Sequence, residues 1–95
     1  DNGEAVFVNM TADWCITCKV NERIALGTNK VKNAFAAQSI TYLKGDWTNS
    51  DPVITEYLAT FSRNGVPLYV YYAPGKTAVV LPQILTPSIV IDAIR

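Results

Sequence analysis

The chain has 95 residues, 49% of them hydrophobic, and its 8 basic and 8 acidic side chains leave no formal net charge. This length supports one globular domain, and the lack of any run of like charge argues against nucleic acid or an anionic membrane surface as the main partner. Histidine is absent, which excludes Ser-His and Cys-His catalysis, and two cysteines alone are too few for a conventional structural zinc site.

The first part of the chain predicts a strand, a bend and two helices. Residues 5–10 form an apolar run typical of a buried strand, and residues 11–13 form the bend. A helix is expected from Cys15 to Gly27, and a second one after a cap at residues 28–29. Helical spacing gives the first helix an apolar stripe of Ile16, Val20 and Ile24, and the second an inner face of Val31, Ala34 and Phe35.

A strand at residues 39–44 and a loop at 46–50 come next. Asp51-Pro52 combines an N-cap with a proline at the first helical position, and the helix that it opens is expected to stop at Asn64-Gly65. The apolar residues of this third helix are Ile54, Tyr57, Leu58 and Phe61.

The last part of the chain predicts a hairpin and a helix. Residues 68–72 form an aromatic and β-branched strand, residues 73–76 a turn, and residues 77–81 the returning strand. Thr86-Pro87 opens a final helix, which carries Ile89, Val90 and Ile94. Right-handed crossovers then favour an α/β fold whose mixed four-stranded sheet has the order 2-1-3-4, with helices on both faces.

Both cysteines stand in the pentapeptide Trp14-Cys15-Ile16-Thr17-Cys18, between the first strand and the first helix. Thiols three positions apart lie near one face of a helical turn and close a disulfide with little backbone movement. Unpaired N–H groups and the macrodipole at a helix N-terminus favour the thiolate, which is the form that attacks disulfides. The sequence therefore predicts a dithiol/disulfide redox module.

Two other uses of the same thiols compete with this interpretation. A structural disulfide would gain little, because closing so short a loop removes little chain entropy. A Cu(I) site on both thiols is the second alternative, although the chain contains only one methionine and no further thiol to complete such a site.

Two stretches resemble the thioredoxin fold: Ala12-Asp13-Trp14-Cys15-Ile16-Thr17-Cys18-Lys19 after a strand, and Gly65-Val66-Pro67 before a later strand. Residues 6–15 (VFVNMTADWC) and 42–48 (YLKGDWT) further resemble the C-terminal periplasmic domain of DsbD- or ScsB-type membrane thiol:disulfide reductases. The resemblance covers nearly the whole chain but lacks the strand and helix that precede residue 5 in thioredoxin. Because the chain also starts abruptly at Asp1, we expect residues 1–95 to be one thioredoxin-like domain excised from a larger membrane protein.

This resemblance implies a protein-disulfide reductase with no metal and no cofactor beyond its redox-active disulfide. In DsbD-like proteins the domain takes electrons from the membrane-embedded domain, which cytosolic thioredoxin feeds. It passes them to an N-terminal periplasmic domain or directly to periplasmic acceptors, with cytochrome c biogenesis among the processes served. The resemblance thus implies a periplasmic domain of a bacterial inner-membrane protein, monomeric when isolated. A redox-inactive adaptor of the same fold is disfavoured by the intact cysteine pair.

The family also implies roles for single residues. Cys15 is expected to be the nucleophile that forms the mixed disulfide, and Cys18 the thiol that resolves it. Pro67 is predicted to be cis, which costs only about 0.5–1 kcal/mol for an X-Pro bond, and to lie opposite the cysteines. The backbone of Val66 would then pair with an extended substrate segment, and Trp14 would cover the rim of the site and contact partners.

The dipeptide between the cysteines and two nearby polar residues tune this chemistry. Ile16-Thr17 carries no charge to stabilise the thiolate, so we expect a couple nearer the roughly −270 mV of thioredoxin than the roughly −120 mV of DsbA. Glu22, four residues after Cys18, would relay that thiol's proton or disfavour its thiolate, unless it is a solvated surface residue. Asn9 departs from the family, which usually carries a buried Asp there. Its amide cannot accept a proton, so Glu22 or water would have to serve.

Overall fold

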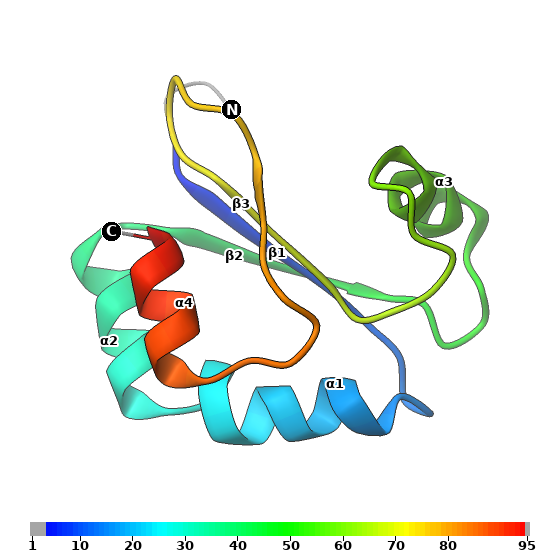
Figure 1. Cartoon of the computed structure of the whole chain (residues 1–95), viewed down its shortest axis with the longest axis horizontal. Coiled ribbons are helices and arrows are strands. Elements are labelled where there is room, and N and C mark those ends of the chain that lie inside the picture. Colours follow the sequence, from blue (N-terminus) through cyan, green and yellow to red (C-terminus); the bar gives the residue numbers. More distant parts are fainter. Residues whose placement is uncertain (1–3, 95) are drawn as a thin grey trace.

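The chain alternates strands and helices in the predicted order (Figure 1). The computed structural model describes residues 4–94, so the expected domain start at Asp1 lies outside the described part. The elements are β1 (Val6–Thr11), α1 (Ile16–Asn21), the π-helix η1 (Glu22–Leu26), α2 (Asn29–Ala37), β2 (Thr41–Asp46), α3 (Pro52–Thr60), β3 (Leu68–Tyr72), β4 (Val79–Val80) and α4 (Pro87–Ile94).

The four strands form one mixed sheet in the order β2-β1-β3-β4, which confirms the predicted order. β1 pairs in parallel with β2 and antiparallel with β3, and β3 pairs antiparallel with β4. β1 is therefore a central strand, and its carboxyl end leads directly to the cysteine pair. Ligand sites of open α/β sheets lie at this end of the strands.

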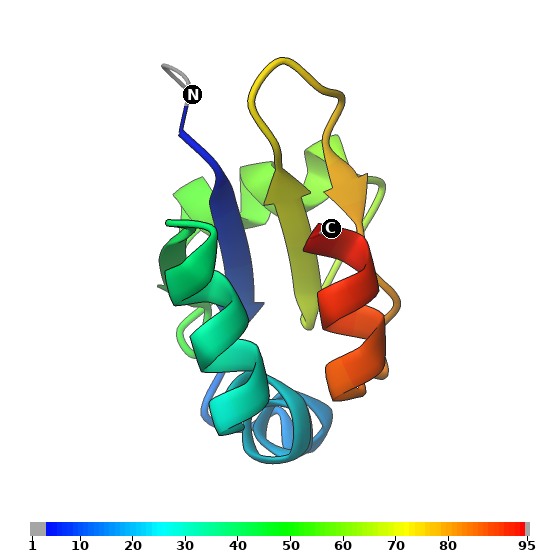
Figure 2. The ribbon, with the colours of Figure 1, turned by 90° about the vertical axis from the view of Figure 1, so that its left-hand side faces the viewer.

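Helices cover both faces of the sheet, as predicted. In Figures 1 and 2, α2 and α4 lie side by side over one face, and α3 lies on the opposite face. The core on the α2 and α4 side includes Phe7, Leu26, Val31, Tyr69, Val90 and Ile94. The core on the α3 side includes Val6, Val8, Leu58, Leu68 and Val70. Alternate residues of β1 and β3 thus enter opposite cores, as the period of two in a strand requires.

The predicted first helix is continuous in space but changes its hydrogen bonding part-way. It is α-helical to Asn21 and then continues as η1. The wider turn ends where the N–H of Gly27 donates to the carbonyl oxygen of Glu22 at 2.6 Å. A Cβ on residue 27 would approach that oxygen to 2.5 Å, so glycine is required for the chain to leave the helix here.

The apolar stripe of this helix does not face the core. Ile16 is 78%, Val20 43% and Ile24 46% exposed. The buried residues of α1 and η1 are instead Cys18, Asn21, Ala25 and Leu26. Two sets of residues share helical spacing in this segment, and the set that contains the buried cysteine faces the sheet. Periodicity alone favoured the wrong set, because three of the four buried residues, Cys18, Asn21 and Ala25, are small or polar.

Two strands differ from their predicted bounds. β2 begins at Thr41, two residues later than expected, because Ser39 adopts a left-handed conformation (φ 54°) after α2. β4 contains only Val79 and Val80, the two residues that pair with β3. The predicted turn at residues 73–76 is present, with the N–H of Lys76 donating to the carbonyl oxygen of Ala73 and Gly75 at φ 72°. No helix within residues 4–94 has the length and apolar composition needed to cross a membrane.

Candidate active site

Cys15 and Cys18 form a disulfide at the start of α1, with their Cα atoms 5.3 Å apart. The N–H of Cys15 donates to the carbonyl oxygen of Ala12, which closes the bend after β1. Cys15 is the N-cap of α1, and its Sγ accepts a hydrogen bond of 3.1 Å from the N–H of Cys18. A backbone donor thus points at this sulfur, as expected at a helix N-terminus.

The two cysteines differ in their exposure to solvent. Cys18 is fully buried and Cys15 is 7% exposed. Ala12 and Val66 pack against them. Cys15 is therefore the more accessible cysteine of the pair.

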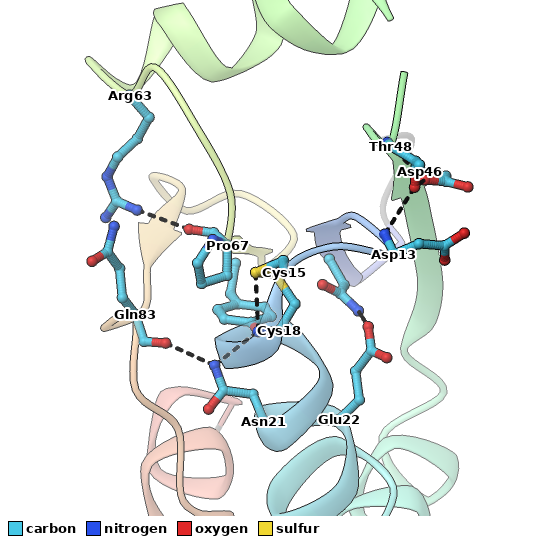
Figure 3. The surroundings of a disulfide bond; sticks show 12 residues. Asp13, Cys15, Cys18, Asn21, Glu22, Asp46, Thr48, Arg63, Pro67 and Gln83 are labelled. Atoms are coloured by element: carbon cyan, nitrogen blue, oxygen red, sulfur yellow. Dashed lines mark hydrogen bonds between the residues drawn. A yellow bond between two sulfur atoms is a disulfide. The ribbon is translucent and has the colours of Figure 1, made fainter. Parts of the chain in front are cut away.

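The predicted cis bond between Val66 and Pro67 is confirmed. Contact of Val66 with the cysteine cluster brings this bond to the disulfide, and Figure 3 shows the Pro67 ring beside it. Arg63, from the segment after α3, donates from Nη1 to the carbonyl oxygen of Pro67 at 3.2 Å. The site thus joins the end of β1, the start of α1 and the segment before β3.

Trp14 forms part of the exposed rim of the site. Its side chain is 55% exposed, and its Nε1 donates to the carbonyl oxygen of Thr48 at 3.0 Å. The N–H of Asp13 donates to Oγ1 of the same threonine at 2.8 Å, and the rings of Trp14 and Trp47 are 5.8 Å apart. Hydrogen bonds from Thr48 also lower the pKa of Asp46. The loop after β2 thus holds Trp14 in place beside Cys15.

Glu22 belongs to a polar cluster under the helix. Nδ2 of the buried Asn9 donates to Glu22 Oε2 at 3.2 Å and to the Tyr42 hydroxyl at 2.7 Å. Lys44 Nζ lies 3.8 Å from Glu22 Oε1. The half-buried Glu22 is thus directed toward β1 and β2, and one turn of helix separates it from Cys18.

Asn21 is the site residue that sequence analysis missed. It is buried, and its Nδ2 donates to the Tyr69 hydroxyl at 2.9 Å and to the carbonyl oxygen of Gln83 at 2.7 Å (Figure 3). Its Oδ1 accepts from the N–H of Leu85 at 3.0 Å. Through these hydrogen bonds, Asn21 connects α1, the helix that carries the disulfide, with β3 and with the segment before α4. Its one sequence signal is a helical spacing of three from Cys18.

A metal is not required for the chemistry of this arrangement. A dithiol/disulfide pair carries two electrons by itself. Within the described range, no three His, Cys, Asp or Glu side chains lie close enough together to hold a metal ion.

A mixed sheet of this order that presents a cysteine pair at a helix start, opposite a cis proline, is the architecture of thiol:disulfide oxidoreductases. The sequence agrees with this class. A sequence model of the thioredoxin-like family matches residues 1–74, and the chain belongs to that family.

The resemblance to DsbD is confirmed by similar proteins. The chain is 36% identical over 73 residues to the thiol:disulfide interchange protein DsbD 1 of Pseudomonas aeruginosa, an alignment that covers 77% of this chain and 12% of the relative. It therefore spans only a small part of that protein. The thioredoxin-like fold also matches the C-terminal domain of Neisseria meningitidis DsbD at 21% identity in both redox forms. The oxidised form has a TM-score of 0.80 (96% of this chain, 78% of that chain), and the reduced form 0.77 (95% and 77%).

Proposed function

We propose that this domain is a protein-disulfide reductase that relays electrons by dithiol-disulfide exchange through Cys15 and Cys18. The observation that carries the proposal is the asymmetry of the pair. Cys15 caps α1, accepts a backbone hydrogen bond on its sulfur and is the more accessible cysteine, whereas Cys18 is fully buried behind it. This asymmetry supports a role for Cys15 as the thiol that attacks a partner and for Cys18 as the thiol that resolves the product.

The exchange proceeds in two balanced steps. The Cys15 thiolate attacks one sulfur of a partner disulfide, and the partner's other sulfur leaves as a thiolate. Cys18 then gives up its proton and attacks Sγ of Cys15, which releases the partner's first sulfur as a second thiolate. The partner gains two electrons and takes up two protons, and the Cys15–Cys18 disulfide is restored.

Glu22 is our candidate acceptor for the Cys18 proton. It follows Cys18 by four residues on the same helix, and its Oε2 and Oε1 lie near Asn9 and Lys44 respectively. The side-chain nitrogen of Asn9 acts as a hydrogen-bond donor in this cluster, and an amide cannot take up the proton itself. A half-buried carboxylate within one helical turn of the thiol is then the nearest base on this element.

Trp14, Val66 and Pro67 are our candidates for substrate binding. Within the described chain, neither the N–H nor the C=O of Val66 forms a backbone hydrogen bond. An extended segment of a partner can therefore pair with Val66 beside the disulfide, in a short β-augmentation. The exposed ring of Trp14 would flank the same segment on the other side of Cys15.

The donor and the acceptors follow from the likeness to DsbD. We propose that the domain is part of a larger inner-membrane protein of bacteria and faces the periplasm. Its electron donor would be the membrane-embedded domain of the same protein, and its acceptors periplasmic proteins with disulfides, including those of cytochrome c biogenesis. The 36% identity to part of a thiol:disulfide interchange protein supports this assignment.

A redox titration tests the proposal. The protein is equilibrated in glutathione and dithiothreitol buffers, and the state of Cys15 and Cys18 is followed by thiol trapping. We expect a reversible two-electron couple with a potential below about −200 mV. A potential near −120 mV would make the domain an oxidant. Failure to cycle, together with Cu(I) retention against a chelator, would instead identify a copper-handling module.

A further inference from the structure

The side-chain carbonyl of Asn9 has no partner in a fully buried position. Asn9 lies in β1 with no exposed surface, and its Oδ1 forms no hydrogen bond within residues 4–94. Buried acceptors are almost always satisfied in folded proteins, so an unsatisfied one requires an explanation. A reaction that creates a hydrogen-bond donor near Asn9 Oδ1 would explain why this acceptor is kept.

The orientation of this amide is fixed by its neighbours. Both Nδ2 hydrogens are used, one by Glu22 Oε2 and one by the Tyr42 hydroxyl. The reverse orientation would place Oδ1 against the Glu22 carboxylate, which is itself an acceptor. Oδ1 is therefore held away from Glu22 rather than free to exchange places with the nitrogen.

The same side of the helix carries the buried cysteine. Glu22, which binds Asn9 of β1, follows Cys18 by four residues, so the two side chains leave the same face of the helix. Cys18 is fully buried, and its sulfur has no hydrogen while the disulfide is closed. Reduction creates one new buried donor, the Cys18 S–H, on the helical face from which Glu22 reaches the Asn9 amide.

We propose that Asn9 Oδ1 accepts a hydrogen bond from the Cys18 thiol in the reduced domain. The inference rests on the proposed function. When the disulfide takes up two electrons and two protons, the proton on Cys18 points to Asn9 and stays on sulfur. The dithiol form thereby gains a hydrogen bond that the disulfide form lacks. Asn9 thus stabilises the reduced state and holds Cys18 as a thiol until a base removes its proton.

Infrared spectroscopy of the S–H stretch tests this bond directly. Cys15→Ala leaves Cys18 as the only thiol, and we expect its S–H stretch at a lower frequency than that of a free thiol. Adding Asn9→Leu should return the stretch to the free value. Adding Asn33→Leu, at an exposed position of α2, should leave it lowered. A stretch that is the same with and without Asn9 would overturn the inference.

The redox equilibrium gives a second readout. Asn9→Leu should shift the equilibrium with glutathione toward the disulfide by about three- to tenfold, the effect of one hydrogen bond. Tyr42→Phe and Glu22→Gln are the controls, because these two residues are the other partners of the Asn9 amide. We expect each of them to shift the redox equilibrium less than Asn9→Leu does. No shift in Asn9→Leu would contradict the inference.

An NMR measurement on the unmodified protein does not depend on whether a variant folds. The side-chain carbonyl carbon of Asn9 should change its NMR chemical shift on reduction, whereas that of Asn33 should not. An unchanged Asn9 signal in a domain whose disulfide cycles normally would overturn this inference and leave the proposed function standing. Failure of the disulfide to cycle would instead overturn the proposed function.

Discussion

The backbone N–H of Cys18 donates to Sγ of Cys15 at 3.1 Å, so the two cysteines are joined by a hydrogen bond as well as by the disulfide. This donor belongs to the first turn of α1 and needs no reduction or oxidation to be in place. In the reduced domain it would stabilise negative charge on Cys15, because hydrogen bonds to the charged form favour that form.

Alkylation of the reduced domain should therefore be selective. We expect iodoacetamide to modify Cys15 faster than Cys18 by about tenfold or more, because Cys18 is fully buried. Mass spectrometry of peptides at early times measures both rates. Equal modification of the two cysteines would contradict the assignment of Cys15 as the nucleophile.

Glu22→Gln should slow the second step of exchange. The amide keeps a side chain of the same size near Asn9 but cannot accept the Cys18 proton. We expect ring closure from the mixed disulfide to slow by about tenfold or more, with the first step little changed. Stopped-flow measurement of both steps separates them. Glu56→Gln, at an exposed position of α3, is the control, and equal rates in the two variants would show that Glu22 does not accept the Cys18 proton.

Asn21→Ala should destabilise the fold strongly. The change leaves the Tyr69 hydroxyl, the Gln83 carbonyl and the Leu85 N–H without their shared partner. We expect the free energy of unfolding to fall by about 2–4 kcal/mol in urea titrations of the oxidised protein. Asn33→Ala, on the exposed side of α2, should change it by less than about 0.5 kcal/mol. A similar effect of both substitutions would contradict the structural role of Asn21.

For the exposed stripe of the first helix, we expect substitutions to have little effect on stability. Ile24→Lys should change the free energy of unfolding by less than about 0.5 kcal/mol, because the side chain is 46% exposed. Leu58→Ala, at a fully buried position of α3, should cost about 2–5 kcal/mol. Thermal unfolding of both variants measures the difference. A large loss in Ile24→Lys would show that the stripe is buried after all.

Stability should also fall at alkaline pH. Burial raises the pKa of Tyr69 to about 12 from its usual 10.0, although the hydrogen bond from Asn21 acts in the opposite direction. The unfolded chain thus loses this proton at lower pH than the folded one, so the contribution is fully present below about pH 10 and is lost between about pH 10 and 12. Burial raises the pKa of Tyr42 and of Tyr57 as well. Tyr69→Phe should reduce the slope of stability against pH in this range, and an unchanged slope would assign it to other groups.

Features that depend on local chemistry could be predicted from the sequence. Alternating periodicities gave the order of elements, and the cysteine spacing with Val66-Pro67 gave the disulfide and the cis bond. The pentapeptide carries the signal for the disulfide within a few residues. The cis bond was predicted through the family resemblance that the pentapeptide and Val66-Pro67 establish together.

Features that depend on distant contacts could not be predicted. Asn21 binds residues 48, 62 and 64 positions away, and nothing near it in the chain indicates those partners. The outward orientation of Ile16, Val20 and Ile24 was missed for a related reason. Their spacing is that of a core face, and only tertiary contacts, such as those of Asn21, Ala25 and Leu26, decide which face is buried.

The three hydrogen bonds of Asn21 also bear on how this domain opens. They connect the middle of the helix to β3 and to the N–H of Leu85, which precedes α4. Segments connected in this way tend to unfold together as one cooperative unit. The amide protons of α1 and of Leu85 should then exchange with deuterium at the same free energy of opening. Access of solvent to Cys18 would thus be controlled in part by the C-terminal third of the chain.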